Sequence, residues 1–144
     1  MRGFAAIALD RCKDRANLGG VLRAAGCFDA KLVLVSGSRI SKFSTDTMKA
    51  YKHVPCIEVD DILASNPYGV VPVAVEIGEN ARNICNFVHP ESALYIFGPE
   101  DGTIKESLLS KITTKIQIPT LHCLNLAATV NVVLYDRLCK QRTK

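Results

Sequence analysis

Apolar runs alternate with amphipathic and polar stretches along the whole chain. Several runs are almost continuously apolar, as is typical of strands buried on both faces of a sheet. The predicted strands are Phe4–Leu9, Lys31–Val35, Cys56–Val59, Val70–Ile77, Ala93–Phe97 and Lys115–Ile118. Helical patterns separate these runs. The sequence therefore predicts an α/β fold, with a parallel sheet flanked by helices on both faces.

The helical segments differ in how much apolar surface they carry. Asn17 is expected to cap a helix whose apolar face is formed by Leu18, Val21, Leu22, Ala25 and Phe28. The last helix, Leu124–Lys140, is apolar nearly all round, which predicts that it is buried or lies at a dimer interface.

Short helical segments are predicted between these two helices. Ser44–Tyr51 forms one, and Ile62–Ala64 forms another that is capped by Asp60 or Asp61. A capping box, Thr103–Glu106, is expected to open a third ahead of Leu108 and Leu109.

Composition narrows the class of protein. With 144 residues, of which 48% are hydrophobic, one folded domain is expected. No apolar run approaches a membrane span, and Phe4–Leu9 is too short for a signal peptide, so we predict a cytoplasmic protein. The six cysteines include no CxxC pair, which disfavours a metal site and a disulfide framework. The net charge of +4 is compatible with a polyanionic partner without requiring one.

Two loops follow predicted strands and carry polar groups suited to chemistry. GPEDG (98–102) is a glycine-lined acidic loop directly after Ala93–Phe97, and Ile118–Pro119 leads through a short polar loop into the last helix. Loops at the carboxyl ends of neighbouring parallel strands form the ligand crevice of an α/β sheet. His122 and Cys123 are adjacent, but neighbouring side chains in an extended loop point opposite ways, which disfavours a catalytic Cys–His pair.

A third segment, NLGGVLRAA (17–25), opens the first helix. Gly19 and Gly20 allow close backbone approach at a helix N-terminus, and Arg23 could clamp a phosphate. A capped helix with one solvated arginine explains the same pattern. The segment lacks GxGxxG, so the dinucleotide fingerprint is absent.

Taken together, the three segments resemble the signature motifs of the SpoU/TrmH family, the RNA 2′-O-ribose methyltransferases of the SPOUT superfamily. The motifs are matched in order by Asn17, Gly19, Arg23 and Ala25, by Gly98 and Glu100, and by Ile118, Pro119, Asn125 and Ala127. The resemblance covers nearly the whole chain. Cys123 stands where the family usually has Ser, and Phe28–Asp29 replaces the usual Phe-Gly.

This resemblance implies a fold, a cofactor and partners. It implies a single SPOUT domain over residues 1–144 without an N-terminal RNA-binding extension, whose C-terminal segment forms a deep trefoil knot. It also implies S-adenosylmethionine as cofactor, RNA as substrate with tRNA preferred over rRNA, and a homodimer whose active site is completed across the interface.

Residue roles follow from the same resemblance. The implied catalytic residues are Arg23, Asn17, Glu100 and Asn125, with Glu100 and Asn125 orienting Arg23 and the cofactor loop. The implied cofactor-binding residues are Glu76, Ile96, Phe97, Gly98, Ile118, Leu121, Cys123, Leu124 and Ala127. Phosphate contacts are expected from Arg11, Lys13, Arg15, Lys42, Lys49, Lys52 and the tail Lys140–Lys144.

Two other classes of function stay open at this point. One is a module that binds the cofactor or RNA without turnover, for which the Cys123 departure is the support. The other is a flavodoxin-like or Rossmann nucleotide-binding protein, which the missing glycine fingerprint disfavours.

Overall fold

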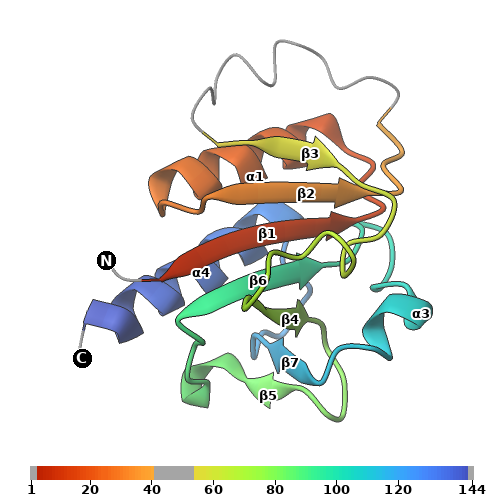
Figure 1. Cartoon of the computed structure of the whole chain (residues 1–144). Helices are drawn as coiled ribbons and strands as arrows, with labels where there is room; N and C mark the ends of the chain where they lie inside the picture. The colour runs from red at the N-terminus through yellow and green to blue at the C-terminus, as the bar shows by residue number, and fades with distance from the viewer. Residues whose placement is uncertain (1–2, 41–53, 143–144) are drawn as a thin grey trace.

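In the computed structural model, which describes residues 3–40 and 54–142, the strands form one sheet in the order β3-β2-β1-β6-β4-β7-β5 (Figure 1). All the paired strands run parallel. The strands are β1 (Phe4–Asp10), β2 (Leu32–Ser36), β3 (Cys56–Glu58), β4 (Val71–Val75), β5 (Arg82–Asn83), β6 (Ser92–Phe97) and β7 (Thr114–Gln117). The helices are α1 (Arg15–Cys27), the 3₁₀ turn η1 (Ile84–Asn86), α3 (Glu106–Leu109) and α4 (Leu126–Arg142). The predicted parallel α/β sheet is confirmed, while the knot stays a prediction.

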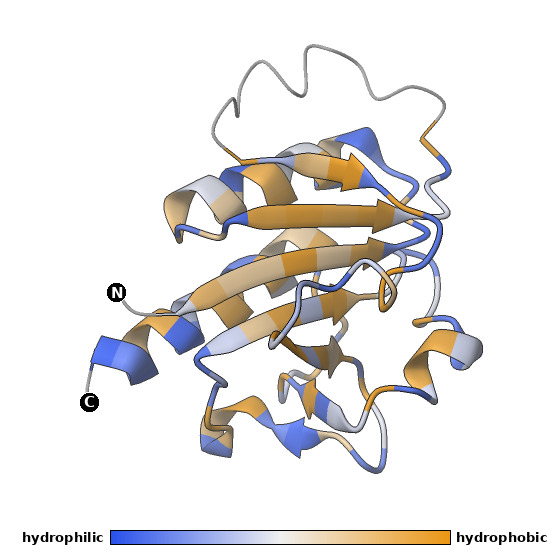
Figure 2. Ribbon diagram, in the orientation of Figure 1, coloured by the Kyte–Doolittle hydropathy of each residue, from blue (hydrophilic) through white to orange (hydrophobic). Residues whose placement is uncertain are grey.

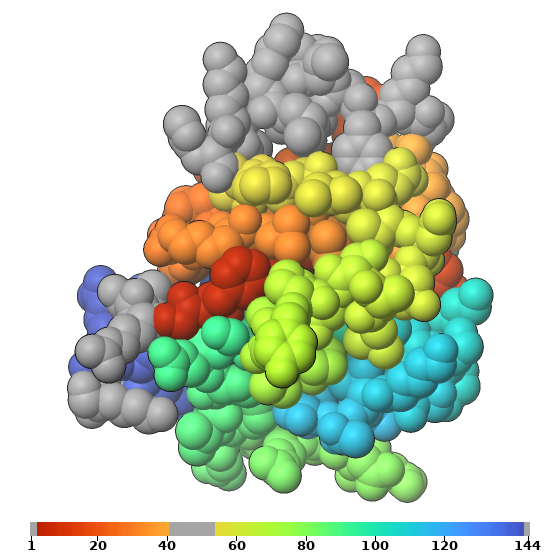
Figure 3. All heavy atoms as spheres, in the orientation of Figure 1, coloured from red at the N-terminus to blue at the C-terminus, as the bar shows by residue number. Residues whose placement is uncertain are grey.

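The two faces of the sheet are covered differently. Helices α1 and α4 lie side by side on one face, and they approach closely at Gly20, where a Cβ would come within 2.7 Å of the Ala127 Cβ (Figure 1). The connection over residues 59–70 crosses the other face (Figure 3). Its Ile62 belongs to one hydrophobic cluster with Ala8 of β1 and Leu108 of α3. The central strands β1 and β2 are mostly apolar, whereas the edge strand β5 is polar (Figure 2). This pattern follows the burial of the central strands on both faces.

Several predicted element boundaries are wrong for local reasons. Asp14, not Asn17, caps α1, because its carboxylate accepts hydrogen bonds from the N–H groups of Ala16 and Asn17. Both residue types are good caps, and the one that comes three residues earlier takes the position. Asn17 therefore lies inside the first turn, with its side chain available for other partners.

Other short elements also differ from the sequence prediction. The capping box is wrong: α3 begins at Glu106, and Lys105 at its N-cap makes no side-chain capping bond. Residues 62–64 form a turn rather than a helix, closed by Asp61 accepting from the Ala64 N–H. The helix α4 begins at Leu126, two residues later than predicted. The pattern indicated neither β5 nor η1, since each is only two or three residues long, and Ser44–Tyr51 lies outside the described residues.

The C-terminus of α1 explains the departure at Asp29. The Ala30 N–H donates to the Ala25 carbonyl, a Schellman-type ending, and Asp29 takes the left-handed conformation with φ of 58°. Glycine is the residue usually found there, and Asp tolerates the conformation better than most others.

The Asp29 position gives a stability prediction. Asp29→Gly should leave the melting temperature unchanged or raise it, because the left-handed strain is relieved. Asp29→Ala should lower the free energy of unfolding by about 1 kcal/mol, because alanine keeps the strain and cannot form a local hydrogen bond. Thermal denaturation of both variants measures the difference. A more stable Ala variant than Gly variant would contradict this account of Asp29.

A buried polar network fastens α4 to β6 and to the loop before β6. Arg137 donates to the Tyr95 hydroxyl at 3.1 Å and to the carbonyls of Pro90 and Glu91 at 2.7 and 2.6 Å. The Tyr95 hydroxyl lies 2.7 Å from His89 Nδ1, and His89 Nε2 lies 2.7 Å from Asp136. These contacts fit one neutral tautomer, in which Tyr95 donates to Nδ1 and Nε2–H donates to the Asp136 carboxylate.

This network makes stability depend on pH. Burial lowers the pKa of His89, and the hydrogen bond to Asp136 offsets only part of that effect. The folded protein therefore takes up a proton at His89 less readily than the unfolded chain, whose histidine pKa is about 6.5. Stability that is present above this pH is expected to be lost as the pH falls through the lower folded value. The melting temperature should fall between pH 7 and 5, and less so in His89→Gln, which keeps one donor and one acceptor without titrating. Equal pH slopes in both proteins would rule out His89 as the source.

Candidate functional site

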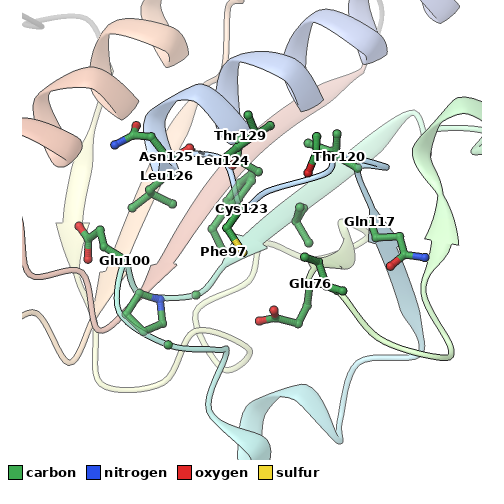
Figure 4. Close-up of a pocket in the computed structure, with 16 residues that line it drawn as sticks. Glu76, Phe97, Glu100, Gln117, Thr120, Cys123, Leu124, Asn125, Leu126 and Thr129 are labelled. Atoms are coloured by element: carbon green, nitrogen blue, oxygen red, sulfur yellow. Dashed lines mark hydrogen bonds between the residues drawn. The ribbon is translucent and has the colours of Figure 1, made fainter.

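A cavity of about 400 Å³ opens at the carboxyl ends of three adjacent strands, β6, β4 and β7. The predicted loops after β6 and β7 both border it. The two strands are not direct neighbours as predicted, since β4 lies between them and pairs with both. The cavity is lined by Val75, Glu76, Ile77, Phe97, Gly98, Pro99, Glu100, Gly102, Gln117, Ile118, Thr120, Cys123, Leu124, Asn125, Leu126 and Thr129. Figure 4 shows Glu100 and Asn125 on one side of this cavity and Gln117 and Thr120 on the other.

The floor of the cavity depends on a glycine. At Gly98 a Cβ would come within 2.7 Å of the Ile104 nitrogen and 2.9 Å of the Thr103 carbonyl carbon, so the 98–104 loop closes tightly on its own backbone. Glu76, at the end of β4, accepts a hydrogen bond from the Ile104 N–H at 2.8 Å. One carboxylate oxygen of Glu76 therefore fastens the loop, and this explains a strand-end carboxylate that the sequence left ambiguous.

Glu100 is an acceptor shared by the loop after β1 and the helix α1. Its Oε1 accepts from the Asn17 side-chain amide at 3.2 Å and from the Asp14 N–H at 3.2 Å, and its Oε2 accepts from the Lys13 N–H at 3.1 Å. The Cys12 thiol lies 3.3 Å from Oε1. Burial by itself would raise the pKa of Glu100, but backbone N–H donors and the Cys12 thiol together outweigh it and lower the pKa. Glu100 is therefore held as a carboxylate at neutral pH.

The Cys12 thiol is a donor in this arrangement and not a nucleophile. Its burial, followed by its contact with Glu100, raises the pKa of Cys12 to about 12. A thiolate is the reactive form of cysteine, so the raised pKa disfavours a nucleophilic role for this thiol.

A chain of side-chain hydrogen bonds links Glu100 to the third motif. Asn125 donates from its amide to the Asn17 Oδ1 at 2.8 Å, while its own Oδ1 accepts from the N–H groups of Ala127 and Ala128 and caps α4. Glu100, Asn17 and Asn125 thus form one connected series. Each amide orientation is fixed by its neighbour, since Asn17 donates to Glu100 and accepts from Asn125.

The structure brings together three of the four predicted catalytic residues. Arg23 is exposed on α1 and does not line the cavity. The expected contacts of Glu100 and Asn125 with Arg23 are replaced by their contacts with Asn17. Asn17 could be recognised from the family pattern, but its role as the link between the other two needed the fold.

Of the predicted cofactor-binding residues, Glu76, Phe97, Gly98, Ile118, Cys123 and Leu124 line the cavity. The remaining three do not. Ile96 is fully buried in the core on the face of the sheet away from α1, Leu121 is 97% exposed, and Ala127 packs against Gly20. Gln117, Thr120, Leu126 and Thr129 line the cavity without having been predicted. Their positions beside the third motif were the available signal.

Some of the basic residues expected to contact phosphate have internal partners. Arg11 donates to the Asp10 carboxylate and the Thr103 carbonyl, and Lys13 lies 3.5 Å from Asp101. Lys140 pairs with Asp136 at 2.7 Å. Lys42, Lys49 and Lys52 and the last two residues lie outside the described residues. Within residues 3–40 and 54–142, no three His, Cys, Asp or Glu side chains are grouped to hold a metal, and no helix is long and apolar enough to cross a membrane.

Comparison with sequence models of protein families identifies the family of this chain. The sequence model of the SpoU rRNA Methylase family matches residues 5–135, a span that includes all three motifs. The chain belongs to this family. The resemblance found in the sequence is thereby confirmed. Comparison with curated proteins gives no match to this SpoU family member.

Solved structures share the fold of this SpoU family member. A Porphyromonas gingivalis protein described as an RNA methyltransferase of the TrmH family is 21% identical, with a TM-score of 0.82. The methyltransferase AviRb from Streptomyces viridochromogenes, solved with AdoMet, is 18% identical with a TM-score of 0.82. The match to the Porphyromonas protein covers 99% of this chain and 61% of that protein. The match to AviRb covers 100% of this chain and 63% of AviRb.

A third structure matches in length as well. It comes from a study of the 2-OH methylation of C/U34 on tRNA, is 21% identical, and has a TM-score of 0.83. The match covers 99% of this chain and 93% of that one. At these identities the likeness establishes the common fold.

Proposed function

We propose that this chain is a methyltransferase that transfers a methyl group from S-adenosylmethionine to a ribose 2′-hydroxyl of RNA. Membership of the SpoU rRNA Methylase family supports the reaction class. The observation that carries the proposal is the connected series Glu100–Asn17–Asn125 at the rim of a cavity of about 400 Å³. It unites all three motif segments at one place, as a shared active site requires.

The residues of the cavity fit this cofactor. Its volume lies within the usual range of ligand pockets, which is about 300–1,000 Å³. Apolar side chains such as Phe97, Ile118 and Leu126 suit an adenine ring, while Glu76 and Gln117 offer polar atoms for a ribose and an amino acid group. At Gly98 the loop beside the cavity closes on its own backbone, where a Cβ would lie 2.7 Å from the Ile104 nitrogen, so this position requires a residue without a side chain.

The chemistry divides between cofactor and protein. When bound, S-adenosylmethionine would supply a methyl group on a positively charged sulfur: the O–C bond would form as the S–C bond breaks, with S-adenosylhomocysteine as the leaving group and the hydroxyl proton passing to water. The protein must hold the hydroxyl in line and stabilise negative charge on its oxygen. A guanidinium stays protonated at neutral pH, so Arg23 would act by electrostatic stabilisation and not as a base.

We propose that Arg23 acts across a dimer interface, at the cavity of the partner protomer. Its helix α1 packs beside α4, whose outer side exposes Val132 by 38% and Tyr135 by 60%. Apolar side chains exposed on α4, the helix that packs beside α1, favour burial against a second copy of the chain. Such a homodimer would carry Arg23 toward the partner's cavity, which explains why Arg23 does not line the cavity of its own protomer.

We propose that the substrate is tRNA and that the protein acts in the cytoplasm. One of the solved structures that this chain matches over nearly their full length concerns methylation of tRNA. The family description names rRNA, so rRNA is the alternative that the experiment must separate.

The test is transfer of tritiated methyl groups to unmodified tRNA and rRNA pools. Wild type should label tRNA, at a linkage that resists alkaline cleavage on its 3′ side. Arg23→Ala should lower methylation by about a hundredfold or more while cofactor affinity stays near normal, because Arg23 acts on the RNA side. Arg82→Ala is the matched control, since Arg82 is an exposed arginine on the edge strand β5 and its loss removes the same charge.

The outcomes are distinct. Label found only in the rRNA pool would mean that the reaction is as proposed but that its substrate is rRNA and not tRNA. Loss of cofactor affinity in Arg23→Ala would overturn its assignment to the RNA side. Cofactor binding without label in either pool would favour a binding module without turnover.

A further inference from the structure

Arg39, in the loop after β2, joins three loops at the carboxyl edge of the sheet. Its guanidinium donates to both carboxylate oxygens of Asp101, at 3.0 and 2.6 Å. The same group donates from Nε and Nη2 to the Arg11 carbonyl, at 3.2 and 3.0 Å. The Arg39 N–H donates to the Cys12 carbonyl at 2.9 Å. The loops after β1, β2 and β6 are therefore tied together by one residue.

Arg39 binds the loop after β6 and the loop after β1, which are the same two loops that the hydrogen bonds of Glu100 join. Asp101 is the next residue after Glu100, and Arg11 and Cys12 are the two residues immediately before Lys13 and Asp14, whose N–H groups donate to Glu100. A displacement of either side would lengthen the hydrogen bonds to Glu100. Because Glu100 also fixes Asn17, the displacement would reach Asn125 as well.

We propose that Arg39 is a positioning residue for the methyl-transfer reaction, acting through Asp101 and the backbone of residues 11–12 on Glu100, Asn17 and Asn125. This inference rests on the function proposed above. A planar guanidinium suits the role, because its fork binds a carboxylate at two points while the remaining N–H groups reach a carbonyl.

A role in stability would look different. The side chains of Arg39 and Asp101 are each 44% exposed, and exposed ion pairs contribute little to the free energy of unfolding. The hydrogen bond from the Arg39 N–H to the Cys12 carbonyl does not involve the side chain, so Arg39→Ala keeps its donor. Removing the guanidinium should therefore leave the fold intact and loosen only the loops around Glu100.

The first test needs no substrate. Amide hydrogen exchange should become about tenfold faster or more at Lys13 and Asp14 in Arg39→Ala, because their acceptor is no longer held in place. Amides in the central strands β1 and β6 should keep their protection, and the melting temperature should change by less than about 2 °C. Unchanged exchange at Lys13 and Asp14 would overturn the proposal, whether or not the chain methylates RNA.

The second test uses turnover. Arg39→Ala should lower kcat by about tenfold to a hundredfold, as expected for misplaced active-site groups. Arg39→Lys should recover only part, since an ammonium cannot form the two-point contact. Asp101→Asn should have a similar effect, and the double variant Arg39→Ala/Asp101→Asn should be no slower than Arg39→Ala alone.

The matched control is Lys31→Ala. Lys31 forms an exposed ion pair with Asp29, with side chains 49% and 65% exposed, but it lies before β2, at the opposite edge of the sheet from Arg39. We expect wild-type kcat in this variant. Wild-type kcat in Arg39→Ala, or a large fall in its melting temperature together with the lost activity, would each overturn a positioning role. An inactive wild type would instead count against the proposed function, and the exchange experiment would still decide the role of Arg39.

Discussion

Gly98→Ala is expected to weaken S-adenosylmethionine binding by about tenfold to a hundredfold, since relieving an overpacked contact costs about 1–3 kcal/mol. The new Cβ would lie 2.7 Å from the Ile104 nitrogen and 2.9 Å from the Thr103 carbonyl carbon, and backbone atoms cannot rotate away as a side chain can. The 98–104 loop must then move, and the hydrogen bond from the Ile104 N–H to Glu76 is lost with it. Isothermal titration calorimetry with S-adenosylhomocysteine and S-adenosylmethionine measures the effect.

The control for this variant lies in the same loop. A Cβ on Gly102 would meet only the Pro99 side chain, at an ordinary 3.6 Å. Gly102→Ala should therefore bind the cofactor nearly as wild type does. If both alanine variants bind equally well, the loop is more adaptable than the close contact at Gly98 indicates, and the cavity assignment loses its main steric argument.

Arg137→Ala is expected to lower the free energy of unfolding by about 3 kcal/mol, because it leaves buried polar groups without their donor. Arg137 is 5% exposed and serves the Tyr95 hydroxyl and the carbonyls of Pro90 and Glu91. Burial raises the pKa of Tyr95 to about 12, and Arg137 opposes that rise, so the hydroxyl stays protonated with or without the arginine. For a chain of this length the melting temperature should fall by roughly 6–12 °C.

Arg142→Ala tests whether the loss is specific. Arg142 is an exposed arginine on the same helix, so its removal changes the charge of α4 without opening the core. We expect its melting temperature within about 2 °C of wild type. Comparable losses in both variants would mean that the helix charge, and not the buried network, governs stability.

The sequence predicted the strands well because burial leaves a direct mark on composition. β1 and β6 lie in the centre of the sheet, and both appear as uninterrupted apolar runs. Short elements failed for the same reason, since Arg82–Asn83 pairs with β7 at a polar edge and carries no apolar signal. Helix starts failed where two capping residues competed, as Asp14 and Asn17 do at α1.

The residues of the functional site were likewise predicted only in part. The family pattern named Asn17, Glu100 and Asn125 as residues of one site, and the fold then brought them into hydrogen-bonding contact. The pattern also predicted that Glu100 and Asn125 contact Arg23. Within the protomer both side chains contact Asn17 instead. Arg39 and Asp101 carried no signal at all, since a charged pair 62 residues apart looks like two ordinary surface residues.

By itself the sequence determined the strand cores, the class of fold and the family, because these depend on local burial patterns and on short motifs that can be read in order. The tertiary structure alone decided which loops meet. The placement of β6 between β1 and β4 sets the 98–104 loop against residues 12–14 on one side and Glu76 on the other. Contacts between segments so far apart depend on strand order, and strand order is fixed by how whole helices and strands pack, which no local pattern encodes.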